Sequence, residues 1–290
     1  MKGTQTHTQL ILPSLDRTPP SDQGSIVFIG NATVLIRFGG LTILTDPTFI
    51  HRHEQVSIGY GLHSTRLTDP AIDIDGLPPL DLVVLSHFHG DHFDQVAEQR
   101  LNKQVPIVTN REAVEALRTR NFTQARGLDT WETMTVVKGA MRLRITSMPG
   151  RHGPPLANLV MPDVMGSMLE FEPESGSGFR LYITGDTLII DDLKEIPRRY
   201  PDIDLALLHL GGTRVLGILV TMDAKQGVEM LRIVHPRQAI PIHYNDYDVF
   251  KSPLSDFQRA VEAEGMERHV RYLSHGETYS LQANAKQAAA

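Results

Sequence analysis

A segment rich in histidine and aspartate follows an apolar stretch in the first third of the chain, and it constrains the fold more than any other feature. It reads Ser-His-Phe-His-Gly-Asp-His over residues 86–92, directly after Leu-Val-Val-Leu at residues 82–85. The apolar stretch predicts a buried strand, and ligands of α/β proteins gather where strands end. His87 and His89 are two positions apart and are expected to point the same way. The pattern predicts a metal site. The alternatives are a histidine-rich surface loop and a histidine pair that caps the following helix.

Composition narrows the ligands that such a site can use. The 290 residues include 13 histidines and no cysteine. Disulfides, thiolate zinc sites, iron–sulfur clusters and a cysteine nucleophile are therefore excluded, and any metal must bind His, Asp or Glu. The chain has 28 Lys and Arg against 34 Asp and Glu, a formal charge of −6. Because this balance provides no basic surface for nucleic acid or anionic lipid, we expect no nucleic-acid partner.

The distribution of polar and apolar residues indicates one globular domain. Apolar residues make up 41% of the chain and charged residues 21%, as in ordinary globular proteins. Residues 1–24 are polar and contain prolines, and residues 284–290 are mostly Ala, Lys and Gln, so we expect loosely held ends around a single domain at residues 25–283. No apolar run reaches the ~20 residues of a membrane span, and the first residues lack a signal-peptide core, so we expect a cytoplasmic protein.

Alternation and turn residues predict the order of strands and helices. Residues 25–46 are rich in β-branched side chains and contain Gly39-Gly40, which indicates a β-meander with a two-residue hairpin. Strand and helix patterns then alternate, which favours an α/β fold with two sheets face to face and helices outside. The predicted strands are residues 81–86, 105–109, 135–138, 141–147, 164–171, 179–184, 204–210, 239–243 and 270–273, and the predicted helices are residues 94–103, 111–119, 191–199, 223–234 and 254–265.

The pattern His-x-His-x-Asp-His after a buried strand resembles the signature of the metallo-β-lactamase superfamily. This resemblance implies a four-layer αββα sandwich and three further ligands downstream, each in a loop that follows a strand. His152, Asp186 and His243 each follow a predicted strand, in the order that the superfamily has. Taken singly, His152 is as well explained as a loop histidine, Asp186 as a helix cap and His243 as a core histidine. Their joint order favours the interpretation as ligands.

The resemblance also implies a centre of two divalent ions. One ion would be held by three histidines, the other by an aspartate and two histidines, with a second aspartate as the bridge. These ligands are His87, His89 and His152; Asp91, His92 and His243; and Asp186 as the bridging carboxylate. Imidazole and carboxylate ligands suit zinc, which we expect first, and manganese, which we expect second.

A second motif lies in the opening meander, Gly30-Asn-Ala-Thr-Val-Leu-Ile-Arg37 together with Thr45-Asp-Pro47. It resembles the superfamily branch that contains ascorbate-6-phosphate lactonase and N-acyl phosphatidylethanolamine phospholipase D. Those relatives usually begin Gly-His-Ala-Thr, whereas this chain has Asn31 in place of the histidine, and asparagine retains hydrogen-bonding capacity. Asp46 is either a carboxylate that orients a ligand imidazole or a turn aspartate at the end of a strand.

The resemblance implies a binuclear hydrolase in which a metal-bridging hydroxide attacks a lactone or another carboxylic ester. A phosphodiester is the alternative substrate, and a non-catalytic metal-binding or sensing module is the alternative from another class. Asp91, Asp186 and His209 are expected to act in catalysis, Asp91 by orienting the hydroxide or passing a proton to the leaving group. His209 ends a predicted strand, where it either polarises the substrate or packs in the core.

Substrate choice is expected to lie in the loops. Residues 49–63 form an irregular stretch that would rim the site, with His51, Arg52 and His53 either facing an acidic group or solvated. Arg214 is a candidate for binding phosphate or carboxylate, with an exposed loop charge as the alternative. The expected partner is a small-molecule ester or phosphoester, with no membrane span, and a homo-oligomer is left open.

Overall fold

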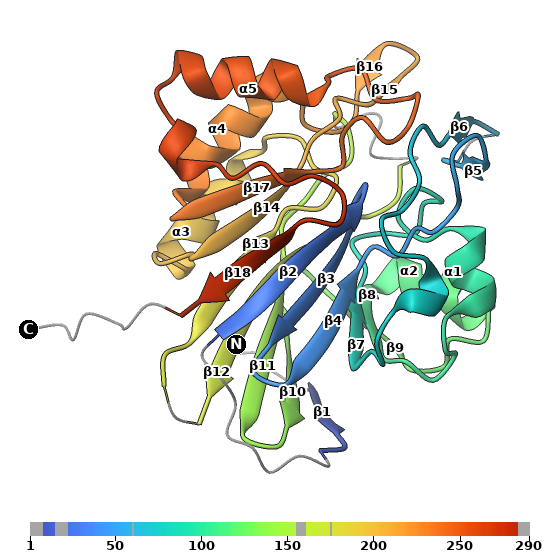
Figure 1. Cartoon of the computed structure of the whole chain (residues 1–290), viewed down its shortest axis with the longest axis vertical. Coiled ribbons are helices and arrows are strands. Elements are labelled where there is room, and N and C mark those ends of the chain that lie inside the picture. The colour runs from blue at the N-terminus through green and yellow to red at the C-terminus, as the bar shows by residue number, and fades with distance from the viewer. Residues whose placement is uncertain (1–7, 15–22, 60, 155–160, 175, 284–290) are drawn as a thin grey trace, which may run out of the picture.

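The β-branched segment near the start of the chain forms the predicted antiparallel meander (Figure 1). Its strands are β2 (Gln23–Gly30), β3 (Thr33–Phe38) and β4 (Leu41–Thr45). Gly39 and Gly40 have φ angles of 57° and 82°, the positive values that a tight two-residue hairpin requires. A second turn at Asn31-Ala32 separates β2 from β3, so Asn31 and Asp46 lie at the same end of the meander.

The computed structural model describes residues 8–14, 23–59, 61–154, 161–174 and 176–283, and within these ranges the long strands form two seven-stranded sheets. The meander belongs to the sheet ordered β18-β2-β3-β4-β7-β8-β9, in which β4, β7, β8 and β9 run parallel. Its remaining strands are β7 (Leu82–Val84), β8 (Ile107–Asn110), β9 (Ala125–Leu128) and β18 (Thr278–Gln282).

The other large sheet has the order β1-β10-β11-β12-β13-β14-β17, antiparallel from β10 to β13 and parallel from β13 to β17. Its strands are β1 (Thr8–Leu12), β10 (Thr133–Lys138), β11 (Met141–Met148), β12 (Gly166–Pro173), β13 (Phe179–Ile183), β14 (Leu205–His209) and β17 (Gln238–Ile242). Two short hairpins lie outside the large sheets, β5 (Gln55–Ser57) with β6 (His63–Thr65) and β15 (Arg214–Val215) with β16 (Ile218–Leu219).

Helices cover the outer face of each sheet, which confirms the predicted αββα sandwich (Figure 1). One apolar cluster packs α1 (Gln95–Arg100) and α2 (Arg111–Arg118) on the sheet that contains the meander. Another packs α3 (Glu195–Arg199), α4 (Ala224–Val234) and α5 (Leu254–Ala263) on the second sheet. The largest cluster lies between the two sheets and includes the Phe38 ring, stacked 5.4 Å from that of Phe179.

Three expectations about local structure need correction. Residues 8–12, inside the segment expected to be loosely held, form β1 and pair in parallel with β10. The last strand lies at Thr278–Gln282 against β2 and not at residues 270–273, where Val270 makes only an isolated bridge to Ala239. The stretch at residues 49–63 contains β5 and the start of β6, so it is partly regular.

Two further predictions need comment. The predicted helix at residues 191–199 is divided into a 3-10 turn (Asp191–Lys194) and α3. The expected tail at residues 284–290 lies outside the described residues. In the part of the chain that the structure describes, no helix is both long enough and apolar enough to cross a membrane.

Candidate metal centre

The loops that follow β7, β11, β13 and β17 meet at one end of the sandwich and bring the predicted ligands together. These side chains fall into two groups, and within each group one ligand atom per residue lies within 4.8 Å of the others. The groups are His87, His89 and His152, and Asp91, His92, Asp186 and His243. This division is the one that the sequence resemblance implied, with Asp186 placed beside the second set.

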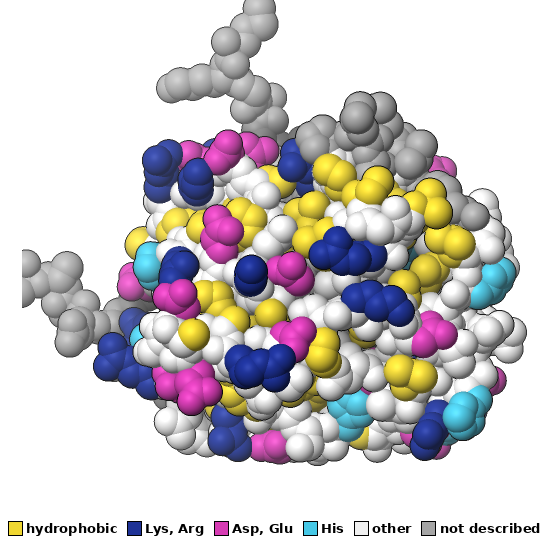
Figure 2. Space-filling model, turned by 90° about the horizontal axis from the view of Figure 1, so that it is seen from above, with side chains coloured by type: hydrophobic (Ala, Val, Ile, Leu, Met, Phe, Trp, Pro, Cys, Tyr) yellow, Lys and Arg dark blue, Asp and Glu magenta, His cyan; other side chains and the backbone are white. Residues whose placement is uncertain are grey.

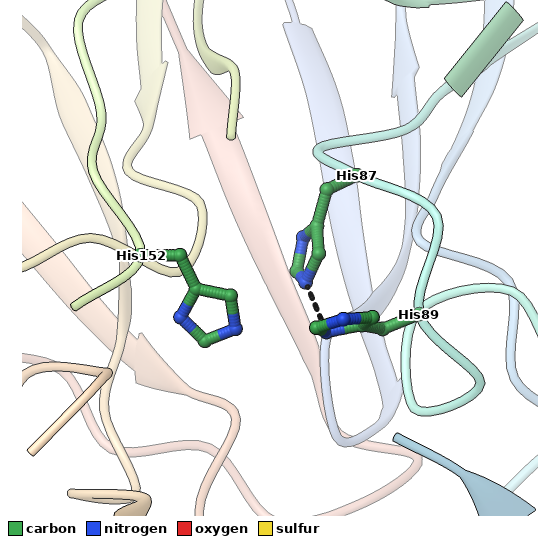
Figure 3. A group of neighbouring side chains, drawn as sticks. All are labelled: His87, His89 and His152. Carbon is green, nitrogen blue, oxygen red and sulfur yellow. Dashed lines mark hydrogen bonds between the residues drawn. The ribbon is translucent and has the colours of Figure 1, made fainter. Parts of the chain in front are cut away.

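The first group contains only imidazoles. His87 and His89 leave the loop after β7, His152 leaves the loop after β11, and their rings point toward one another (Figure 3). His87 Nε2 lies 3.1 Å from His89 Nδ1, and the His152 ring centroid is 5.2 Å from that of His87. His87 and His152 are buried, whereas His89 is half-buried and opens toward the surface. Three ring nitrogens thus converge on a common point.

The second group combines two carboxylates with two imidazoles, all buried. His92 Nε2 lies 3.2 Å from Asp186 Oδ2 and 3.9 Å from Asp91 Oδ2. His243 Nε2 is 3.5 Å from Asp91 Oδ2, and its Nδ1 is 3.4 Å from Asp186 Oδ1. His92 also stacks close to the first group, with its ring centroid 4.1 Å from that of His87. The two groups are therefore adjacent parts of one centre.

Three buried ligand atoms of this centre lack a hydrogen-bond partner among the described residues. They are Asp91 Oδ1, Asp186 Oδ1 and His243 Nε2. A buried polar atom without a partner is unfavourable, and such atoms usually mark a missing ion or water. Nitrogen and carboxylate oxygen are ligands of zinc and manganese. The residues therefore fit divalent cations bound in this place.

Backbone carbonyls determine which nitrogen of two histidines is free to bind. His152 Nδ1 lies 2.8 Å from the carbonyl oxygen of Val220, and His243 Nδ1 lies 3.2 Å from that of Leu210. A carbonyl oxygen only accepts, so each Nδ1 must carry the proton in these contacts. In the neutral ring the lone pair is then on Nε2, the atom turned toward the centre. Metal-binding histidines are commonly held in this way.

Burial and neighbouring charges set the protonation of the centre. Burial lowers the pKa of His87 well below its ordinary value and, with the nearby His152, lowers that of His89 to about 4. Both imidazoles are neutral near pH 7, as metal binding requires. Burial alone would raise the pKa of Asp91, but the adjacent His92 and His243 outweigh it and lower the value to about 2. The pKa of Asp186 is likewise well below its usual range, because His243 and His92 outweigh burial.

Asp46 links the centre to the core behind it. Its Oδ2 lies 3.3 Å from His92 Nδ1 and 3.2 Å from His209 Nε2, and its Oδ1 accepts the Ser86 N–H at 2.7 Å. These contacts match the interpretation of Asp46 as a carboxylate that orients an imidazole. Burial opposes ionisation of Asp46, yet the hydrogen bonds from His209 and His92 hold its pKa below the ordinary value.

His209 lies behind the centre and away from the described lining of the pocket. It is fully buried, and its Nδ1 is 3.3 Å from Thr184 Oγ1. The structure thus places it against Asp46, in the position of the core alternative. His209 contacts Asp46, and Asp46 contacts His92. The hypothesis for His209 is therefore that it positions His92 through Asp46.

Asn31 joins the loop that carries Asp91 to the strand end that carries His243. Its side-chain amide donates to the Asp91 carbonyl at 2.5 Å, and its own carbonyl accepts the His243 N–H at 2.7 Å. Its N–H donates to Asp246 Oδ2 at 2.9 Å. Asn31 has a φ of 53°, in the left-handed region that asparagine tolerates better than most residues. Its place in the motif is therefore explained by backbone support of two candidate ligands.

Two substitutions of Asn31 are expected to separate its side chain from its backbone conformation. Asn31→Gly loses the hydrogen bond to Asp91 and should lower the free energy of unfolding by about 1–2 kcal/mol. Asn31→Ala adds the cost of a left-handed alanine and should lower it by about 2–3 kcal/mol. Urea unfolding of both variants measures the difference. Equal losses in the two variants would contradict the role of the left-handed conformation.

A small pocket opens over the centre. Its floor contains side chains from both groups, and its walls are mostly apolar and come from the two short hairpins and neighbouring loops. The lining is His89, Asp91, His152 and Asp186, with Ile58, Met161, Thr213, Val215, Val220 and Val249. No lysine or arginine occurs in this described lining. On the face in Figure 2, basic side chains are interspersed with acidic ones and do not form a broad basic surface.

The rim only partly follows the sequence predictions. Ile58, from the stretch at residues 49–63, lines the pocket, whereas His51, Arg52 and His53 are exposed, with His51 Nδ1 3.2 Å from Asp69. Arg214 is exposed and donates to the Gly217 carbonyl at 3.0 Å. These four basic side chains lie outside the described lining of the pocket, and the acidic group that His51 faces belongs to Asp69 of the chain itself.

Gly90 fixes the rim to the centre. Its N–H donates to the Ser57 carbonyl of β5 at 3.0 Å, and a Cβ at Gly90 would lie 2.5 Å from that same oxygen. The residue between His89 and Asp91 must therefore lack a side chain, because the rim hairpin packs directly on it.

Sequence reasoning missed the three valines of the pocket wall and Thr213. Val215, Val220 and Val249 are β-branched residues, and nothing local distinguishes a pocket valine from a core valine. Thr213 precedes Arg214 in a glycine-rich segment, which indicates a loop but not a side chain turned toward the centre.

Comparisons with known proteins identify the family and the fold of the chain. Residues 42–244 match the family model described as a beta-lactamase superfamily domain. A UPF0173 metal-dependent hydrolase of Opitutus terrae is 33% identical over 264 residues, covering 88% of this chain and 99% of the relative. A UPF0173 metal-dependent hydrolase of Archaeoglobus fulgidus is 28% identical over 206 residues, covering 69% of this chain and 82% of the relative. The crystal structure of an isothiocyanate hydrolase from Delia radicum gut bacteria has a similar fold, with a TM-score of 0.74, 20% identity, and coverage of 89% of this chain and all of that one.

Proposed function

The chain belongs to the beta-lactamase superfamily as a metal-dependent hydrolase of the UPF0173 family, and from this premise we propose that it cleaves an uncharged carboxylic ester or lactone at a centre of two divalent ions. The observation that carries the substrate class is the pocket. Its described walls are apolar and include no lysine or arginine. The two groups of candidate metal ligands lie below walls that provide no positively charged side chain. Such a pocket suits a neutral substrate better than a negatively charged one.

The residues that would hold the ions are those of the two groups. His87, His89 and His152 would bind one, and Asp91, His92 and His243, grouped with Asp186, would bind the other. Two divalent ions held by these residues would lower the pKa of a bound water and would act as a Lewis acid on the scissile carbonyl oxygen. Zinc is proposed first and manganese second.

The side chains around the ions orient and protect the reaction. Asp91 lines the pocket, and the partnerless Oδ1 of this ionised carboxylate is available to accept a hydrogen bond from water or substrate. Asp46 holds His92 from behind, and the Val220 and Leu210 carbonyls hold His152 and His243. The apolar walls exclude bulk water from the scissile bond, which strengthens the electrostatic interactions there.

Two alternatives differ in what they require of the pocket. A phosphodiester substrate carries a negative charge that a nearby arginine or lysine would help to bind, and the described lining offers neither. A non-catalytic sensing module would retain the ligands without turnover. We also propose that the chain is related to the branch with ascorbate-6-phosphate lactonase and N-acyl phosphatidylethanolamine phospholipase D, which its meander resembles. The cytoplasm is the proposed compartment of the protein.

A substrate panel tests the proposal. Protein loaded with zinc, and separately with manganese, is assayed with lactones, short-chain esters, thioesters, an alkyl isothiocyanate and bis(p-nitrophenyl) phosphate. The expected result is the highest kcat/KM for a lactone or an ester. A higher value for the phosphodiester would favour the first alternative, and no turnover of any compound by fully loaded protein would favour the second.

A further inference from the structure

Thr213 presents a buried hydroxyl that no described residue satisfies. The residue is 7% exposed, it lines the pocket, and its Oγ1 has no hydrogen-bond partner in the described part of the chain. The other polar side chains of that lining belong to the two metal-ligand groups. Thr213 is thus a neutral hydrogen-bonding group at the pocket that the metal-ligand groups do not use.

The backbone holds Thr213 in a fixed relation to the centre. Its N–H donates to Thr221 Oγ1 at 2.8 Å, and its carbonyl accepts the Val220 N–H at 2.9 Å. The carbonyl of the same Val220 accepts from His152 Nδ1 at 2.8 Å. One residue therefore connects Thr213 to a candidate ligand of the first group, and the backbone of Thr213 cannot shift relative to that ligand without breaking these bonds.

An unsatisfied hydroxyl is costly to bury, whereas a valine of the same shape carries no such cost. Val215 and Val220 show that valine side chains occupy the same pocket wall. A threonine at position 213 therefore has no stabilising advantage in the free protein. A ligand with an acceptor atom in the pocket would give this hydroxyl the partner that the described residues do not provide.

We propose that Thr213 contacts the substrate and that its hydroxyl donates a hydrogen bond to an acceptor oxygen of the bound ester. This inference rests on the proposed function and refines its substrate class. In this proposal the apolar walls would contact the carbon skeleton of the ester, and Thr213 together with the centre would contact its polar group. The favoured substrate is then an uncharged ester or lactone with a short alkyl substituent next to its oxygens.

Two variants test the contact. Thr213→Val removes the hydroxyl and keeps the shape, and Thr213→Ser keeps the hydroxyl and removes a methyl group. Both are loaded with zinc and compared with the wild type in kcat and KM on the best ester of the panel, in metal content, and in the Tm of the ligand-free protein. Thr213→Val is expected to lose about ten- to a hundredfold in kcat/KM, and Thr213→Ser to stay within about threefold of the wild type.

Stability separates substrate contact from a structural role. If the hydroxyl is unpartnered in the free protein, Thr213→Val retains its metal and has a Tm equal to or above that of the wild type. A lower Tm or a loss of metal in Thr213→Val would overturn the inference, as would wild-type kcat/KM. If the wild type hydrolyses no ester, the proposed function has failed. In that case the Tm still tests the hydroxyl: a Tm of Thr213→Val below the wild-type value would show that Thr213 Oγ1 has a stabilising partner in the free protein.

Discussion

Replacing Asp186 with asparagine is expected to lower kcat/KM for ester hydrolysis by about 10³-fold, equivalent to about 4 kcal/mol, and to reduce the bound metal. The substitution preserves volume and removes one charge from the middle of the centre. Asp186 Oδ2 lies 3.2 Å from His92 Nε2, and its Oδ1 is buried without a hydrogen-bond partner among the described residues. Its charge also raises the pKa of His87 and of His152 against the larger, opposite effect of burial.

Asp191→Asn is the matched control for this substitution. Asp191 is five positions further along the chain, its side chain is 93% exposed, and it pairs with Lys194 at 2.7 Å. Elemental analysis of the purified variants gives the metal content, and steady-state kinetics give kcat/KM. Asp191→Asn should match the wild type in both. Full metal content and more than a tenth of the activity in Asp186→Asn would contradict a place for Asp186 among the ligands.

The sequence predicts the strands and helices that carry their own local signal. Helices α1, α2 and α4 begin after Asp94, Asn110 and Asp223, each of which accepts a hydrogen bond from the backbone of the first turn, as an N-cap residue does. The buried parallel strands appear as short apolar runs between such helices. These signals are local, so pattern reasoning finds them.

The missed strands depend on distant partners. β9 reads Ala-Arg-Gly-Leu, which has neither β-branched residues nor alternation, and it is a strand because it pairs with β8. Val270 lies in a more strand-like stretch than Thr278–Gln282, yet the Phe28 N–H donates to the Glu277 carbonyl and leads the chain into pairing with β2. Whether such a segment becomes a strand therefore depends on which sheet edge it can pair with in the folded protein.

The candidate ligands could be predicted because the segment at residues 86–92 matches the superfamily signature and the three downstream ligands follow strands in the order that this resemblance implies. Of their supporting contacts, the sequence suggested only the one from Asp46 to a ligand imidazole, as one of two alternatives. Asn31 and Asp246 are hydrogen-bonded across 215 positions, and Asp46 and His209 across 163 positions. No spacing rule connects residues so far apart in sequence. The chemistry of the site is therefore visible in the sequence, whereas its positioning depends on the folded sheets.

Removal of metal by a chelator is expected to lower the Tm by about 10–20 °C, and added zinc should restore it. Asp91 and Asp186 are buried, and each has an oxygen without a partner in the described structure, so a cation that binds only the folded chain removes an unfavourable feature. Two sites, each at a free-metal concentration about 100-fold above its Kd, contribute about 2.7 kcal/mol apiece, and a domain of this size shifts by roughly 2–4 °C per kcal/mol. His87→Ala should recover only part of the shift, because one group loses a ligand. A Tm that is indifferent both to chelation and to added zinc would contradict a metal centre at these residues.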